Sequence, residues 1–211
     1  MPLVYKHIEA NYSLGIWESL EKTEELREKV ILSQVEENLW LQFRSEHRKR
    51  EWLAVRLLFR NLSDQFQTEQ IRYESSGKPV LSMGHSISIS HTGNYVAVLI
   101  SETPSAGIDL EALRPGIVNL AGKFVSQEES LHVPEKRKVE HLHVLWGAKE
   151  VLYKLYSHGG IDFRLDLKTD PFIYNEKGAI HAAIEKQNFR QNYLVNYMRW
   201  NDCMLTWSIG A

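Results

Sequence analysis

A similar order of helical and extended segments occurs twice along the 211-residue chain. This repetition constrains the fold more than any other feature. In the first half, apolar residues recur at near-helical spacing from about Ser19 to Leu62, and a helix is predicted from about Glu46 to Asn61. Strict alternation over Ser86–Ser90, a turn, and the β-rich run Tyr95–Ile100 then predict a hairpin over residues 85–101. Helices therefore precede strands in this half.

The second half has a similar order. A strand is predicted from Ala106 to Leu110, and a strong helix from about Lys138 to His158 that ends at Gly159-Gly160. Three short strands should follow, with turns at Asn175–Gly178 and Trp200–Asp202. The predicted class is α+β, with two halves that join near Glu102–Ala106, where Pro104 interrupts the pattern.

The composition excludes several classes of protein. Hydrophobic residues make up 43% of the chain, which is enough for a packed core. The net charge of −2 gives no bulk attraction to nucleic acid, and the apolar runs are too short to span a bilayer. The first residues lack a signal-peptide core, and the lone Cys203 fits a reducing compartment. We expect a cytoplasmic protein that binds neither membrane nor nucleic acid.

Two acids lie on the predicted strand, in the run Gly107-Ile108-Asp109-Leu110-Glu111. Alternate residues of a strand share a face, so the two carboxylates lie about 7 Å apart on one side. Such a pair can share a hard cation such as Mg²⁺, which keeps room for waters and substrate phosphates. A polar strand face in solvent is the alternative.

The long predicted helix carries Glu150 and Lys154 one turn apart. An exposed pair of this spacing is common and contributes only about 0.2–0.5 kcal/mol. Lys149, however, falls near the middle of the apolar stripe. Either it extends along the helix to reach solvent, or the stripe opens there onto a site that needs a cation.

Glu129 has two possible roles. Ser126 and Glu129 have the spacing of a capping box, which predicts a helix start in which Glu129 caps the backbone. A role as a third carboxylate at a metal requires the fold to bring Glu129 beside Asp109 and Glu111.

Candidate anion-binding residues lie in the first half. Ser90 and His91 stand where a strand enters a turn, a usual place for a ligand contact, although a hydrogen-bonded turn histidine is equally compatible. Lys78 could add a cation from a close-approach loop. Basic residues on the helix of residues 46–61 suit phosphate groups or a solvated surface, and they include Arg50 and Arg56.

Taken in order, these motifs resemble those of the 4′-phosphopantetheinyl transferase superfamily, specifically its larger, surfactin-synthetase-activating type. The patterns G-[IV]-D-[ILV]-E and W-x-x-K-E-x-x-x-K are both complete, at Gly107–Glu111 and Trp146–Lys154. The resemblance spans about residues 44–165. Its other motifs are Gly77-Lys78-Pro79, Ile89–Gly93 and Phe124–Glu129.

The resemblance implies a Mg²⁺-dependent enzyme. The family transfers the phosphopantetheine arm of coenzyme A to a serine of an apo acyl or peptidyl carrier protein, and releases adenosine 3′,5′-bisphosphate. By residue match, Asp109, Glu111 and Glu150 would hold the metal. Glu129 resembles the third acidic position of the family. Because Glu128 is adjacent, either of the two could be that position.

The resemblance also suggests roles around the metal. Glu150 would remove the proton of the carrier serine, and Lys154 would steady the pyrophosphate and leaving group. Contacts to coenzyme A are implied for Lys78, Pro79, Ser90, His91, Arg50 and Arg56.

The fold implied by the resemblance is a pseudo-dimer that works as a monomer. Residues 1–105 and 106–211 would form two similar α/β subdomains, each a small antiparallel sheet packed with a long helix, with one active site in the cleft between them. Two other hypotheses remain at this stage. One is a non-catalytic module that binds coenzyme A or a carrier protein, and the other is a nucleic-acid-binding domain that uses residues 44–60.

Overall fold

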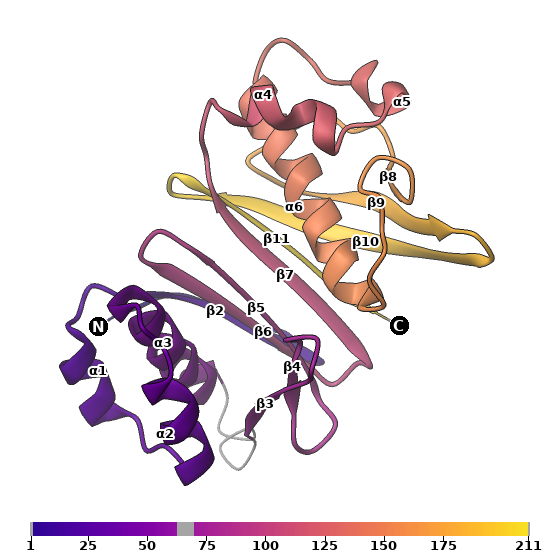
Figure 1. Cartoon of the computed structure of the whole chain (residues 1–211). Coiled ribbons are helices and arrows are strands. Elements are labelled where there is room, and N and C mark those ends of the chain that lie inside the picture. Colours follow the sequence, from indigo (N-terminus) through magenta and orange to yellow (C-terminus); the bar gives the residue numbers. More distant parts are fainter. Residues whose placement is uncertain (1, 63–69, 211) are drawn as a thin grey trace.

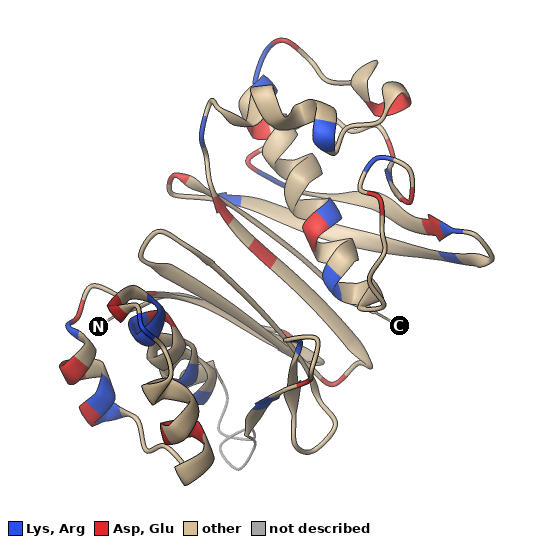
Figure 2. Ribbon diagram, viewed as in Figure 1, with Lys and Arg blue, Asp and Glu red and all other residues tan. Residues whose placement is uncertain are grey.

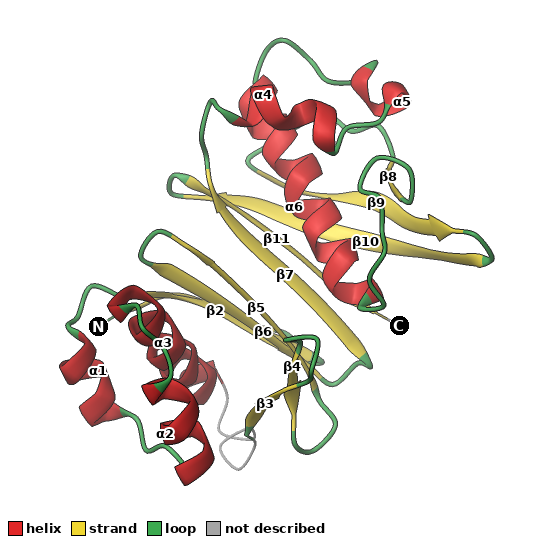
Figure 3. Cartoon of the chain, viewed as in Figure 1, coloured by secondary structure: helices red, strands yellow, loops and turns green. Residues whose placement is uncertain are grey.

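The computed structural model describes residues 2–62 and 70–210. The first half contains β1 (Leu3–Ile8), β2 (Tyr12–Glu18), α1 (Thr23–Lys29), α2 (Gln34–Leu41), α3 (Glu46–Leu62), β3 (Ile71–Tyr73), β4 (Pro79–Leu81), β5 (Ser86–Thr92) and β6 (Tyr95–Ser101). The second contains β7 (Ser105–Ala112), α4 (Ile117–Leu120), the 3₁₀ turn η2 (Ala121–Lys123), α5 (Gln127–Ser130), α6 (Lys138–Tyr156), β8 (Leu167–Thr169), β9 (Lys177–Lys186), β10 (Phe189–Trp200) and β11 (Cys203–Gly210). The predicted α+β class is confirmed (Figures 1 and 3).

Two antiparallel sheets dominate the described part of the chain. The first has the strand order β1-β2-β6-β5, and the second has the order β7-β11-β10-β9-β8. In each half, a strand precedes the long helix in the chain. The last strand of that half then returns to the sheet and pairs with this earlier strand. Thus β6 pairs with β2 after α3, and β11 pairs with β7 after α6.

The hydrophobic core has three main parts, which follow from the alternation of strand side chains. One face of the first sheet packs against α3, through residues such as Val98 and Leu58. One face of the second sheet packs against α6, through residues such as Met204 and Leu152. A shared core of β2, β6, β7 and β11 residues, which includes Leu99, joins the two halves.

The edge strands β5 and β7 lie side by side (Figure 1). We call the contact between these two strands the seam, and it also joins the halves. Side-chain hydroxyls of β5 accept the backbone amide hydrogens of β7. Because both strands have a period of two residues, alternate hydroxyls meet alternate amides. The bonds run from the amides of Ile108, Leu110 and Ala112 to the hydroxyls of Ser88, Ser90 and Thr92, over 3.0, 3.1 and 3.3 Å.

Most predicted elements are present, with shifts at their ends. The helix predicted from Glu46, the hairpin over residues 85–101 and the short helix after Ser126 are confirmed. The long helix ends at Tyr156 rather than at the glycines, because Ser157 adopts the left-handed conformation with φ of 58°.

Other predictions about strands were wrong. Four strands follow α6 rather than three, and β9 already begins within the predicted turn at Asn175–Gly178. The strands β1 and β2 were not predicted. In the described residues, no helix has both the length and the apolar character needed to cross a bilayer.

Candidate active site

Two glycines let α6 lie close against the second sheet. A Cβ atom at Gly107 would stand 2.7 Å from the carbonyl oxygen of Val151, and one at Gly147 would stand 2.5 Å from Oγ1 of Thr206. Real Cβ atoms do not approach so closely, so both positions need glycine. The close approach brings Glu150 and Lys154 of α6 over the acidic face of β7.

Asp109 is the most contacted acid of this face. It is buried, and its Oδ1 accepts hydrogen bonds from Lys154 Nζ at 3.1 Å and from Ser90 Oγ at 3.0 Å. Lys154 Nζ also donates to the backbone carbonyl of Ile108 at 2.6 Å. Asp109 Oδ2 is buried and has no hydrogen-bond partner within the described part of the chain.

Burial and mutual repulsion raise the pKa values of the neighbouring acids. Burial, and then the charge of Asp109, raises the pKa of Glu150 to about 7, although Lys154 opposes the shift. The pKa of Glu111 is raised by the same two causes. We call Asp109, Glu111 and Glu150 the acid cluster. Figure 2 shows the acidic positions of β7 facing the charged stretch of α6.

The donor chemistry of the acid cluster fits a hard divalent cation. Among the residues that the structure describes, no group of three or more His, Cys, Asp or Glu side chains is placed so that it could hold a metal ion. However, a buried carboxylate oxygen without a partner is costly, and Asp109 Oδ2 is such an atom. Carboxylate oxygens are the ligands that Mg²⁺ takes. The cluster therefore has the oxygen ligands and the uncompensated negative charge for that ion.

A cavity of about 410 Å³ adjoins the acid cluster. It lies between the β4–β5 region of the first half and the end of α6, and Lys154 borders both the cavity and Asp109. Lysines at two points of the wall suit an anionic ligand. The lining includes Lys78, Pro79, Ile89, Tyr153, Lys154 and His158.

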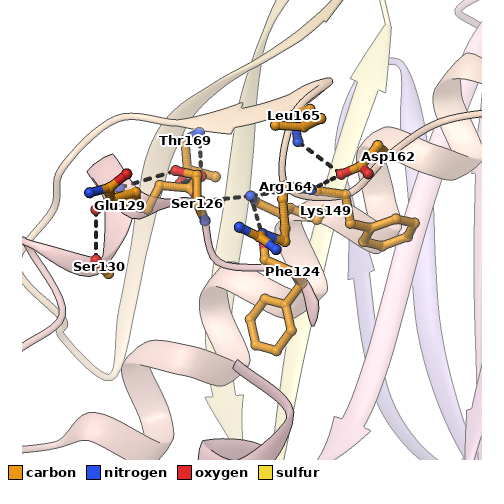
Figure 4. Close-up of polar contacts among 11 residues, drawn as sticks. Phe124, Ser126, Glu129, Ser130, Lys149, Asp162, Arg164, Leu165 and Thr169 are labelled. Carbon is orange, nitrogen blue, oxygen red and sulfur yellow. Dashed lines mark hydrogen bonds and ion pairs between the residues drawn. The ribbon is translucent and has the colours of Figure 1, made fainter. Parts of the chain in front are cut away.

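Lys149 belongs to a separate buried cluster (Figure 4). Its side chain is fully buried, and Nζ donates to Glu129 Oε2 at 2.7 Å and to the carbonyl oxygens of Phe124 and Phe163 at 2.7 and 2.8 Å. Burial lowers the pKa of Lys149 despite the nearby carboxylate. Lys149 thus neither reaches solvent nor faces the acid cluster.

The same contacts occupy both oxygens of Glu129. Oε2 also accepts the Ser126 amide hydrogen in the predicted capping box, and Oε1 accepts from the backbone and hydroxyl of Thr169. Burial would raise the pKa of Glu129, but Lys149 and these hydrogen bonds hold it below its usual value. The structure does not bring Glu129 beside Asp109 and Glu111. Its contacts support capping and lysine pairing rather than metal binding.

The predicted basic contacts separate into different places. Arg56 is 3% exposed, donates to Glu36 Oε1 at 2.9 Å and lies over the Trp52 ring, so it does not border the 410 Å³ cavity. Arg50 borders a small hollow beside Asn94 instead. Neither position supports a contact to a ligand in the 410 Å³ cavity.

His91 is exposed and is tied to α3. Its Nδ1 lies 3.2 Å from Glu51 Oε1, and its Nε2 lies 3.3 Å from a guanidinium nitrogen of Arg48. The sequence predicted no contact of His91 with Glu51 or Arg48, and no role for Thr92. Only Thr92 had a usable signal, because it continues the alternation of hydroxyl residues that includes Ser88 and Ser90.

Residues 36–101 match the family model of the 4′-phosphopantetheinyl transferase N-terminal domain. The chain is similar to a 4′-phosphopantetheinyl transferase of Bacillus subtilis, with 30% identity over 46% of this chain and 42% of the relative. It is similar to AcpT of Salmonella typhimurium, with 32% identity over 51% of this chain and 58% of the relative. HetI of Nostoc sp. shares 31% identity over 54% of each chain.

Part of this chain is thus similar to proteins of the 4′-phosphopantetheinyl transferase superfamily. The chain spans about half the length of the curated relatives it matches. The family-model match includes Lys78, Ser90 and His91 but ends before β7. The acid cluster therefore lies outside the segment that matches the superfamily's N-terminal domain.

Proposed function

We propose that the chain is a Mg²⁺-dependent 4′-phosphopantetheinyl transferase. It would transfer the phosphopantetheine arm of coenzyme A to a serine of an acyl or peptidyl carrier protein and release adenosine 3′,5′-bisphosphate. The observation that carries the proposal is the acid cluster, with Asp109 buried and Glu111 and Glu150 partly buried, next to a lysine-lined cavity. The similarity of part of the chain to 4′-phosphopantetheinyl transferases and the complete motifs at Gly107–Glu111 and Trp146–Lys154 support it.

The chain's own residues supply binding, orientation and a base. Lys78 and Lys154 would bind the phosphates of coenzyme A in the cavity. Glu150 would accept the proton of the carrier serine, since a positioned carboxylate can act as a general base. The serine oxygen then forms a bond to the β-phosphorus of the pyrophosphate, and the bond from that phosphorus to the bridging oxygen breaks.

Asp109, Glu111 and Glu150 would hold Mg²⁺. When bound, the ion neutralises charge on the pyrophosphate, as in other phosphoryl transfers. Lys154 would stabilise the leaving bisphosphate, because it contacts Asp109 and also borders the cavity. Ser90 would act on the acid cluster rather than on coenzyme A.

The finer architecture is also a proposal. Residues 1–105 and 106–211 would be the two subdomains of a pseudo-dimer, of the larger, surfactin-synthetase-activating type, with one active site between them. The matching order of strand, long helix and returning strands in the two sheets supports this. A monomer in the cytoplasm would be sufficient for the reaction.

The direct test is incubation of the protein with coenzyme A, Mg²⁺ and a panel of apo carrier proteins of fatty-acid and peptide type. Mass spectrometry should show at least one carrier gaining a phosphopantetheine group, and a carrier with its acceptor serine replaced by alanine should stay unchanged. If the whole panel keeps its apo mass, the protein is not a transferase and the binding-module hypothesis replaces the proposal.

Asp109→Ala tests the metal site. Calorimetric titration of coenzyme A, with and without Mg²⁺, should show a Mg²⁺-dependent gain in affinity for the wild type and little gain for the variant. Asp202→Ala is the matched control, because Asp202 has a fully exposed side chain in the turn before β11. An unchanged Mg²⁺ effect in Asp109→Ala removes Asp109 from the metal site.

A further inference from the structure

The hydroxyl of Ser90 stands between a backbone amide and a carboxylate. Its oxygen accepts the amide hydrogen of Leu110 at 3.1 Å and donates to Asp109 Oδ1 at 3.0 Å. A serine hydroxyl has only one hydrogen, so the bond from Leu110 leaves that hydrogen for the carboxylate. The side chain is buried, which keeps water from competing for either bond.

Thr92 repeats this arrangement two residues further along β5. Its hydroxyl oxygen accepts from the amide of Ala112 at 3.3 Å and donates to Glu111 Oε2 over a longer distance of 3.4 Å. Ser88 accepts from the amide of Ile108 at 3.0 Å in the same way. The offset that pairs Ser90 with Asp109 pairs Ser88 with Gly107, which has no carboxylate.

The two bonds to Asp109 Oδ1 determine which oxygen remains available. Ser90 and Lys154 both donate to Oδ1, and Oδ2 has no partner among the described residues. The rotation of the carboxylate is therefore set from two sides, one of them a strand of the other half of the molecule. A carboxylate held in this way needs less ordering when it binds a cation.

We propose that Ser90 and Thr92 are positioning residues that hold Asp109 and Glu111, from the first half of the molecule, in the orientation needed to bind a divalent cation. This inference rests on the proposed function only for the identity of the cation. It assigns Ser90 a role different from the coenzyme A contact predicted from the sequence. It also means that the metal site needs both halves of the chain.

The test compares Ser90→Ala with Ser88→Ala. Each variant loses one hydroxyl from the same seam, but only Ser90→Ala loses a bond to a carboxylate. Mn²⁺ is the probe, titrated into the full-length protein without coenzyme A, and the electron paramagnetic resonance signal of the free ion gives the affinity. Removal of a hydrogen-bond partner of a metal ligand typically weakens binding by about 10- to 100-fold.

We expect a loss of about tenfold or more in Ser90→Ala, and an affinity within about twofold of wild type in Ser88→Ala. Thermal unfolding in EDTA should show one cooperative transition for each variant, with the lower melting temperature in Ser90→Ala, because it loses the bond to Asp109 as well as a seam hydrogen bond. Wild-type Mn²⁺ affinity in a folded Ser90→Ala, or an equal loss in Ser88→Ala, overturns the inference.

Thr92 provides a second pair that does not depend on the folding of Ser90→Ala. Thr92→Val keeps the shape but removes the hydroxyl, whereas Thr92→Ser keeps the hydroxyl. Thr92→Val should weaken Mn²⁺ binding. The loss should be smaller than in Ser90→Ala, because the bond from Thr92 to Glu111 is longer than the bond from Ser90 to Asp109. Thr92→Ser should keep the wild-type Mn²⁺ affinity. Equal affinities for Val and Ser overturn the role of Thr92.

The proposed function is judged separately by the carrier assay. A wild-type protein that leaves every carrier unmodified, but whose Mn²⁺ affinity falls in Ser90→Ala, loses the proposed function and keeps this inference. The reverse result, with transfer in the wild type and no Mn²⁺ effect in Ser90→Ala, keeps the function and overturns the inference.

Discussion

Lys149 illustrates what the sequence can and cannot predict about a single residue. Helical periodicity places it in the apolar stripe, and that placement is confirmed by its full burial. The partner that allows this burial, Glu129, lies 20 residues earlier and was considered as a metal ligand. Helical spacing describes one element, whereas a buried ion pair depends on how two elements meet.

The candidate site shows the same division. The motifs predict that Asp109 and Glu111 share a strand face, and that Glu150 and Lys154 share a helix face. Their approach across the two elements follows from tertiary packing. Arg56 was the weakest prediction, because the charge of an arginine does not show whether its partner is a ligand or, as here, Glu36.

Replacement of Glu129 should destabilise the protein in a pH-dependent way. The folded-state pKa of Glu129 is lowered from 4.5, so its contribution is complete above that value and is lost as the pH falls through the folded pKa. Glu129→Gln leaves the Lys149 ammonium buried without a carboxylate, which costs about 3–5 kcal/mol. Chemical denaturation at neutral pH should show this loss of unfolding free energy, and the loss should shrink below pH 4.5.

Glu128→Gln is the matched control, because Glu128 is adjacent but exposed. It should change the free energy of unfolding by less than about 0.5 kcal/mol. If both variants lose equal stability, or if the loss in Glu129→Gln is the same at every pH, the ion pair with Lys149 is not what stabilises this region.

At the scale of elements, strong periodicity predicted α3, α6 and the β5–β6 hairpin. The strands β1 and β2 were missed because neither is a clear apolar run in the sequence. In β1, partly buried residues alternate with exposed ones, and β2 contains a glycine. The end of α6 was placed late, because a serine in the left-handed conformation stops the helix before the glycines do.

Gly107→Ala tests the close packing of α6 on β7. The added Cβ would meet the backbone carbonyl of Val151, which cannot rotate away as a side chain can. We expect a loss of about 1–3 kcal/mol in the free energy of unfolding, measured by chemical denaturation. Activity should fall as well, since Glu150 lies one residue before Val151 and would move with it.

Gly116→Ala is the control for this substitution. A Cβ at Gly116 meets nothing within 4 Å, and the residue has an ordinary helical conformation. Its stability should equal or slightly exceed that of the wild type. If Gly107→Ala is equally harmless, the glycine is not what sets the distance between α6 and the sheet.

At the scale of the whole molecule, the sequence predicts two halves but not the way they join. The shared core pairs residues such as Leu99 of β6 and Leu205 of β11, which are distant in the chain. The seam between β5 and β7 adds hydrogen bonds between the halves. Two similar halves could be independent domains. The extensive contact between these halves is not compatible with that arrangement.

The protein should therefore unfold as one cooperative unit. Differential scanning calorimetry should give a single transition in which the calorimetric and van't Hoff enthalpies agree. A polypeptide of residues 1–105 alone should not unfold cooperatively, because it would expose Leu14, Ile16 and Leu99 of the shared core. Two separate transitions in the full chain would contradict the account of a joined core.

Glu150→Gln provides the most direct test of the central claim, that the acid cluster carries out the transfer. Carrier mass should be followed over time with coenzyme A and Mg²⁺, beside calorimetric titration of coenzyme A. The variant should bind coenzyme A measurably but fail to modify a carrier that the wild type modifies, because the amide cannot accept the serine proton. A near-normal transfer rate in Glu150→Gln would contradict the account.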